Sequence, residues 1–145
     1  MKPFPHKCSN CRKQSVSPVI EDYSTALEHD GRSYSITVPG LSVLVCSECG
    51  ERMLDREAGE KVNAALRAAA GLLQPHEIRQ YREALGINQK MLAEQLGIAP
   101  ATLSRWETGA QIQQRGFDKL LRLYFALPVV RDYLVPKPRP LQRVE

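Results

Sequence analysis

The sequence predicts an α+β fold, in which a small antiparallel β module precedes an all-α region of about five helices. Three observations support this class: two Cys-x2-Cys pairs, alternating apolar residues between those pairs, and helical periodicity from Pro75 onward. We expect a cysteine-containing β module over 1–54, a connecting helix and hinge over 55–74, a helical domain over 75–135 and an extended tail over 136–145.

The positive charge of the chain is concentrated in its second half. The 145 residues carry a formal net charge of +4. Residues 1–50 hold equal numbers of acidic and basic side chains, whereas basic residues outnumber acidic ones over 75–145. Only the second half therefore suits a polyanionic partner such as nucleic acid. No apolar stretch approaches the roughly 20 residues needed to cross a bilayer, and residues 1–7 lack an apolar signal segment. We expect no membrane association and a cytoplasmic location.

The four cysteines, Cys8, Cys11, Cys46 and Cys49, form two Cys-x2-Cys pairs. Two such turns can supply the tetrahedral set of thiolates that zinc prefers. Disulfides would need an oxidising compartment, and a thioredoxin-like motif would need a nearby βαβ unit. Because four thiolates close the zinc shell, we expect one structural Zn2+ and no catalytic metal. His6 or His29 replacing a cysteine is an alternative ligand set.

The segment between the cysteine pairs predicts a short sheet. Apolar side chains alternate over 23–28 and 34–38, and His29–Arg32 contains an Asp-Gly hairpin signal. We expect Pro39-Gly40 to turn the chain before a further strand over 41–45. This sheet is either a partner-binding surface or packing around the metal.

A connecting helix is predicted from Arg56 to Leu73, with Asp55 as its N-cap. The Gln74-Pro75 step interrupts it, because proline biases the preceding residue away from helical geometry. We expect its narrow apolar stripe to pack on the β module or on a neighbouring subunit. The stripe consists of Ala58, Val62, Ala65, Ala69 and Leu72.

The region after Pro75 has the spacing of a helix-turn-helix. A first helix ends at Gly86, Asn88 caps a second helix over 89–96, and a third helix over 100–108 begins at Pro100. Two helices that cross over a short turn need a small residue at their closest approach and a turn residue that tolerates positive φ. Ala93 and Gly97 meet these needs. The alternative is an ordinary helical hairpin.

The third helix is the expected DNA-reading element. Arg105 lies one turn after Ala101, so it can reach guanine O6 and N7 bidentately, while Ala101 can offer a methyl contact to thymine. Gln89 opens the second helix, where its side chain and the first-turn amides can bind a phosphate. The alternative for Arg105 is a solvated side chain or an ion pair with Glu94 or Glu107. The further predicted phosphate contacts are Lys90, Thr102 and Ser104.

A fourth helix over 116–127 is apolar over a wider arc than a monomer core requires. Pro128 can begin a last helix. We expect a homodimer through these C-terminal helices, with a larger intramolecular core as the alternative. The tail over 136–143 alternates proline with basic residues and is expected to be an extended arm.

The second-half motifs, Asn88-Gln89-Lys90-x-Leu92-Ala93-x2-Leu96-Gly97 and Thr102-Leu103-Ser104-Arg105-Trp106-Glu107-x-Gly109, resemble the Xre/phage-repressor class of DNA-binding domains. Together with the two cysteine pairs, the architecture is similar to the MqsA-like (YgiT-type) antitoxins. This resemblance implies a zinc-binding N-terminal domain that docks a protein toxin and a C-terminal domain that dimerises on a palindromic operator. The family can carry a base-reading Asn where this chain has Ala101.

Two hypotheses follow from these motifs. The first is the antitoxin and repressor of a type II toxin–antitoxin module; the second is a stand-alone zinc-containing regulator, responsive to metal or to thiol oxidation. An enzyme is not expected, because the sequence shows no open metal shell, glycine-rich phosphate loop or nucleophile–base pair.

Overall fold

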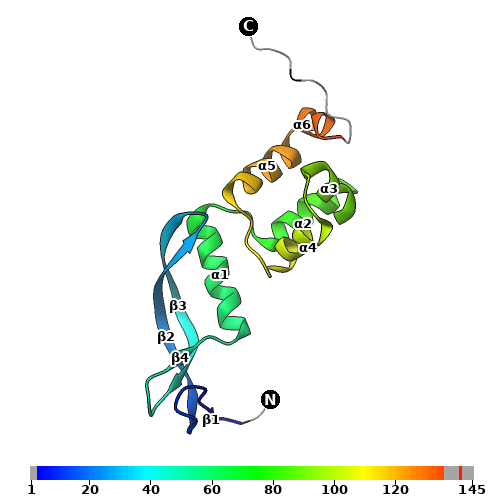
Figure 1. Cartoon of the computed structure of the whole chain (residues 1–145). Coiled ribbons are helices and arrows are strands. Elements are labelled where there is room, and N and C mark those ends of the chain that lie inside the picture. The colour runs from blue at the N-terminus through cyan, green and yellow to red at the C-terminus, as the bar shows by residue number, and fades with distance from the viewer. Residues whose placement is uncertain (1–2, 136–140, 142–145) are drawn as a thin grey trace. The chain divides into compact units, whose positions relative to one another are not determined.

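A long antiparallel hairpin forms most of the N-terminal sheet. The computed structural model describes residues 3–135 and 141, and the chain divides into two units, Met1–Ala70 and Gly71–Glu145. The first unit has a four-stranded sheet in the order β1-β2-β3-β4, followed by one helix (Figure 1). Its elements are β1 (His6–Lys7), β2 (Gln14–His29), β3 (Arg32–Cys46), β4 (Arg52–Met53) and α1 (Arg56–Ala70).

The turn between β2 and β3 is the predicted Asp-Gly turn. Asp30 and Gly31 both have positive φ, 52° and 73°. Positive φ at both central residues is the geometry of a type I′ turn, whose twist matches that of the flanking strands. The hairpin prediction is confirmed, and β2 begins earlier in the chain than the alternation over 23–28 indicated.

The predicted turn at Pro39-Gly40 is wrong, because β3 continues through these residues to Cys46. The register of β2 and β3 shifts between Glu21 and Tyr23, opposite this dipeptide. Gly40 has a φ of 60°, and its N–H donates to Oδ1 of Asp22 over 2.9 Å. A bulge therefore absorbs the proline and the glycine, and the Asp22 carboxylate satisfies a backbone donor at the irregularity.

Helix α1 packs on β3 (Figure 1). Ala58 and Val62 share a buried cluster with strand residues that include Ile36 and Val43. The predicted cap is confirmed, since Asp55 Oδ1 accepts from the N–H of Ala58 over 2.8 Å. The sequence allowed the apolar stripe of this helix to pack on the β module or on a neighbouring subunit. In the structure, Ala58 and Val62 of this stripe pack on the β module.

The connecting helix is shorter than predicted. It ends at Ala70 because Gly71 adopts a φ of 69°, which stops the helix three residues before Leu73. Leu72 and Leu73 lie in the second unit, where both are buried. Ala69, expected on the packed stripe, is exposed.

Helices are the regular secondary structure of the described part of the second unit. Leu92, Ala93, Leu103, Trp106, Leu121 and Tyr124 lie in its core. Asn88 Oδ1 accepts from the N–H of Met91 over 2.8 Å, so the predicted cap of α3 is confirmed. Gly97 has a φ of 71° in the predicted turn. The helices are α2 (Pro75–Ala84), α3 (Gln89–Leu96), α4 (Pro100–Thr108), α5 (Arg115–Ala126) and α6 (Pro128–Tyr133) (Figure 1).

In the described residues, no helix combines the length and apolarity that a bilayer span requires. The predicted extended arm over 136–143 falls, apart from Leu141, outside the described residues.

Candidate functional site

The four cysteine side chains converge at one end of the sheet. Their Sγ atoms all lie within 4.8 Å of one another. The Sγ atoms of Cys8 and Cys49 are 3.7 Å apart, and those of Cys11 and Cys46 are 3.6 Å apart. Zinc–sulfur bonds of about 2.3 Å in a tetrahedron give a sulfur–sulfur edge of about 3.8 Å. The spacing therefore fits a four-thiolate zinc site, and neither His6 nor His29 belongs to the cluster.

Two backbone turns with the same pattern hold the cysteines. In the first, the N–H of Arg12 donates to the carbonyl of Cys8 over 3.0 Å, and the N–H of Cys8 donates to Lys13 O over 2.8 Å. In the second, Gly50 and Cys46 make the equivalent bond of 2.9 Å, and Cys46 donates to Glu51 O over 2.9 Å. Each turn thus aims two sulfurs at a common point.

Each of these turns ends on a residue in the left-handed region. The φ values are 64° at Arg12 and 75° at Gly50. Glycine adopts this conformation without steric cost, whereas arginine does not. The two turns thus have positive φ at equivalent positions, although one of these positions holds a non-glycine residue. This indicates that the fold requires the same turn geometry at both cysteine pairs.

Polar groups around the sulfurs alter the acidity of two thiols. The Ser15 hydroxyl lies 3.0 Å from Cys46 Sγ. This hydrogen bond outweighs the effect of burial and, with backbone donors, lowers the pKa of Cys46 to about 6. A backbone hydrogen bond from Lys13 lowers the pKa of Cys11, but burial and hydrogen bonds with the other cysteines raise it to about 11 overall. The surrounding groups therefore favour the thiolate form of Cys46 and the thiol form of Cys11.

In the second unit, α4 presents a buried and an exposed face. Leu103, Trp106 and Glu107 are buried, whereas Ala101 and Arg105 are exposed one turn apart. Among the described residues, the Arg105 side chain makes no hydrogen bond or ion pair. It therefore does not pair with Glu94 or Glu107, which was the alternative to base contact. The exposed face carries the two side chains predicted to meet bases.

The other predicted contacts are spread over the starts of α3 and α4. Lys90 is exposed in the first turn of α3, and Thr102 and Ser104 are half-buried on α4. The structure differs from the prediction at Gln89, whose Nε2 donates to Oε2 of Glu107 over 2.8 Å. The Gln89 amide group therefore makes a bond within the domain.

A buried ion pair that the sequence did not predict fixes α4 against α2. Arg82 donates from Nε and Nη2 to the two carboxylate oxygens of Glu107 over 2.6 Å and 3.0 Å, and from Nη1 to the carbonyl of Ile87 over 2.9 Å. Burial opposes ionisation of Glu107, but the hydrogen bonds from Arg82 and Gln89, with the charges of Arg82 and Arg79, lower its pKa. The sequence feature that could have indicated this pair is Arg82, an arginine on the apolar face of the first predicted helix.

The match to a family model covers this same region. Residues 78–125 match HTH_3, a helix-turn-helix family. This segment is an Xre-type helix-turn-helix domain. The match implies DNA binding and a role in transcription regulation, and such domains are typical of non-enzymatic regulators. No curated protein matches the chain. The ordinary helical hairpin, the alternative left by the sequence, is excluded.

Proposed function

We propose that this chain is a sequence-specific transcriptional repressor that binds a palindromic operator as a homodimer. This proposal rests on the amphipathic character of α4. Its inner face is anchored by Leu103, Trp106 and Glu107, and its outer face exposes Ala101 and Arg105. In helix-turn-helix proteins the second helix of the motif enters the major groove and contacts base edges through its exposed side chains.

The proposed contacts divide into base readout and phosphate positioning. Arg105 reads a guanine bidentately and Ala101 meets a thymine methyl group. Lys90, Thr102 and Ser104 contact phosphates, which set register without reading sequence. Because the Gln89 amide group is bonded to Glu107, we assign the phosphate contact of Gln89 to its backbone N–H at the start of α3.

The proposed dimer interface is the exposed apolar surface of the last two helices. Leu123 is 47% exposed on α5, Leu127 is 43% exposed after it, and Val129 is 56% exposed on α6. Large apolar side chains left exposed on two successive helices favour a protein interface. Two copies related by a two-fold axis would place two α4 helices about one DNA turn apart, as a palindrome requires.

For the N-terminal unit, we propose that one structural Zn2+ binds to Cys8, Cys11, Cys46 and Cys49 and that the unit docks a protein toxin. Support for the metal comes from the sulfur spacing and the paired turns. Support for the toxin comes from the MqsA-like arrangement of a four-cysteine β module before an Xre-type domain. The repressor would then be the antitoxin of a type II module and would control its own operon.

A stand-alone metal- or redox-responsive regulator is the second candidate, and one observation favours it. Cys49 is exposed, unlike the buried Cys8 and Cys46, so an oxidant can reach one of the four sulfurs. Oxidation of a zinc-bound thiolate releases the metal. In that case the cluster would be a sensor, and no toxin partner would be needed.

Co-purification with the product of the adjacent gene, followed by mobility-shift assays on the promoter, tests both candidates. A stable complex that also shifts the promoter supports the antitoxin. Promoter binding without a complex, lost under mild oxidant and restored by thiol with zinc, supports the sensor. Absence of any promoter preference in the zinc-loaded protein contradicts the repressor assignment itself.

A further inference from the structure

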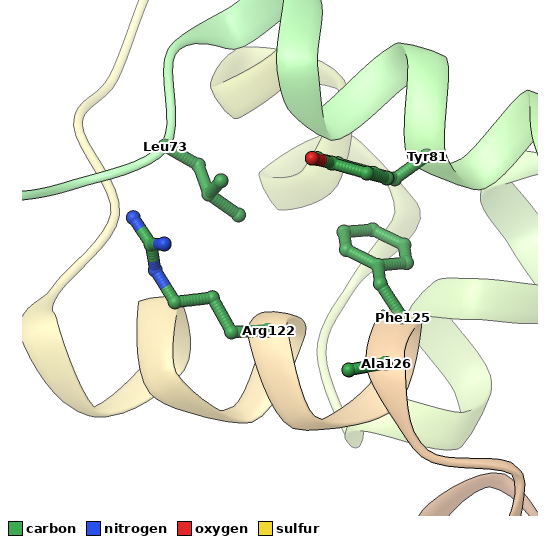
Figure 2. Close-up of a pocket in the computed structure, with 5 residues that line it drawn as sticks. All are labelled: Leu73, Tyr81, Arg122, Phe125 and Ala126. Carbon is green, nitrogen blue, oxygen red and sulfur yellow. The ribbon is translucent and has the colours of Figure 1, made fainter.

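The helix-turn-helix unit contains an open pocket between α2, α5 and the segment before α2. Its volume is about 260 Å³, and its lining consists of Leu73, Tyr81, Arg122, Phe125 and Ala126. Figure 2 shows Leu73 and Arg122 on one side of the space and the two aromatic rings on the other. None of these residues belongs to α4 or to the first turn of α3, so the pocket is separate from the proposed DNA contacts.

One wall of the pocket is aromatic. The rings of Tyr81 and Phe125 are stacked, with centroids 5.4 Å apart and an interplanar angle of 26°. Tyr81 nevertheless remains 50% exposed. Its hydroxyl points across the pocket (Figure 2), and it has no partner among the described residues. A flat ligand placed here meets an aromatic surface and one hydroxyl group.

The opposite wall is held by a buried polar network. Oδ1 of the buried Asp118 accepts from the N–H of Leu73 over 2.8 Å, and Gln113 Nε2 donates to Leu73 O over 2.8 Å. Leu73 is thereby bound through both of its backbone groups. This side of the pocket is preformed, which lowers the entropic cost of binding a ligand.

The Arg122 guanidinium lines the pocket, and only part of its hydrogen-bonding capacity is occupied. Its Nε donates to Asp118 Oδ2 over 2.8 Å, and its Nη2 donates to the carbonyl of Gly71 over 2.9 Å. In the described part of the chain, Nη1 has no partner. Two hydrogen bonds thus orient the guanidinium, and its Nη1 group can still donate to an acceptor.

We propose that this pocket binds a small aromatic carboxylate. A benzene ring fits an engineered cavity of about 150 Å³, so about 260 Å³ accommodates one ring and a short acidic arm. The ring would pack on Tyr81 and Phe125, and the carboxylate would accept from Arg122 Nη1 and the Tyr81 hydroxyl. Because Asp118 already offsets the charge of Arg122, a single negative charge suits the site better than a phosphate dianion.

Titration of the 15N-labelled, full-length, zinc-loaded protein with phenylacetate tests this proposal by NMR. We expect saturable shifts centred on the backbone amides of Leu73, Tyr81 and Phe125. Phenylacetamide, which keeps the ring and lacks the charge, should bind about tenfold more weakly, in line with the strength of a charge-assisted hydrogen bond. Cyclohexylacetate, which keeps the charge and lacks the aromatic ring, should also bind more weakly.

Three variants locate the site. Arg122→Gln removes the guanidinium, and we expect binding to weaken about tenfold. Ala126→Leu fills the pocket without removing a hydrogen bond and should abolish binding, which keeps the test valid if Arg122→Gln folds poorly. Lys119→Gln is the matched control, because it removes one positive charge from α5 outside the lining and should leave binding unchanged.

The proposal is overturned if phenylacetate gives no saturable shifts at millimolar concentration, or if the amide binds equally well. Unchanged binding to the well-folded Ala126→Leu variant would also overturn it, because the ligand would then lie elsewhere. These outcomes are independent of promoter binding, so the pocket and the repressor assignment can fail separately.

Discussion

The guanidinium of Arg82 on α2 forms a bidentate ion pair with the carboxylate of Glu107 near the end of α4. Its Nε lies 2.6 Å from Oε1 and its Nη2 lies 3.0 Å from Oε2. The Arg82 side chain is 10% exposed and that of Glu107 is 0% exposed. The pair therefore joins the helix that presents Arg105 to the first helix of the unit. We expect loss of the pair to disturb the orientation of α4, on which the proposed base contacts depend.

Loss of one member of this pair should destabilise the helical unit. Arg82→Ala leaves the Glu107 carboxylate buried without its main partner, and we expect a loss of about 3–5 kcal/mol in the free energy of unfolding. Trp106 is the single tryptophan of the chain and is buried in the core of the helical unit. Urea unfolding followed by its fluorescence measures the effect on this unit alone.

A double variant provides the control for that measurement. Arg82→Met with Glu107→Met replaces the pair by apolar groups and should recover most of the lost stability. If Arg82→Ala unfolds at the same urea concentration as the wild type, the pair contributes no stability and the prediction is wrong.

The lowered pKa of Glu107 predicts a pH dependence. Its folded-state pKa lies below its ordinary value of 4.5, so the stability it contributes is present above that value and is lost as the pH falls through the folded-state pKa. We expect the Trp106 unfolding midpoint in urea to decrease below about pH 4.5. Glu107→Gln should give a shallower dependence over the same range, and identical slopes for the two proteins would contradict the assignment.

Metal removal should affect the N-terminal unit selectively. The buried residues around the sulfurs are Cys8, Val16 and Cys46, and we expect this core to be too small to persist without a bound cation. Cys46→Ser should abolish stoichiometric zinc, measured by mass spectrometry under native conditions. It should also increase proteolysis around the two cysteine pairs while leaving the Trp106 transition unchanged. A zinc-free chain in which the segments around the two cysteine pairs remain protease-resistant is the contrary result.

The proposed base contact of Arg105 predicts a loss of operator affinity when its side chain is removed. Arg105→Ala should weaken operator binding by about 1–3 kcal/mol and relax specificity at one base position. Lys90→Ala should weaken binding equally on all sequences and lower the salt slope by about one. Arg56→Ala, which removes an exposed charge from α1 in the other unit, is the matched control. Equal affinity of Arg105→Ala and the control, measured by fluorescence anisotropy, would exclude base contact by Arg105.

The proposed dimer interface can be tested at one side chain. Leu123→Glu places a charge on the exposed apolar surface of α5 and should convert a dimer into monomers in light scattering. Operator affinity should fall with it, because a monomer contacts one half-site only. Lys119→Glu, also on α5, controls for the added negative charge. A wild-type protein that is monomeric at micromolar concentration contradicts the interface.

The features that the sequence predicted are those encoded within a few residues. Asn88, Gly97 and the Asp30-Gly31 turn each work through a local backbone requirement, so their types and positions were sufficient to predict them. The cysteine pairs could be assigned to one centre because no other cysteines compete for the metal. The fold class followed from these local features.

The features that the sequence did not predict depend on contacts between distant residues. Pro39-Gly40 is compatible with either a turn or a bulge, and the outcome depends on Asp22, which lies 18 positions before Gly40. The bond from Gln89 to Glu107 likewise joins positions 18 residues apart. Nothing in the local sequence distinguishes a glutamine that binds a phosphate from one that binds a buried carboxylate.

Binding of the zinc-loaded, full-length protein to its own promoter is the most direct test of the central proposal. Fluorescence anisotropy should compare the promoter with a shuffled duplex of equal composition over a range of salt concentrations. A sequence-specific repressor should prefer the promoter by at least about a thousandfold, with affinity for both duplexes falling as salt rises. Equal affinity for the two duplexes, or no binding to either, would contradict the proposal.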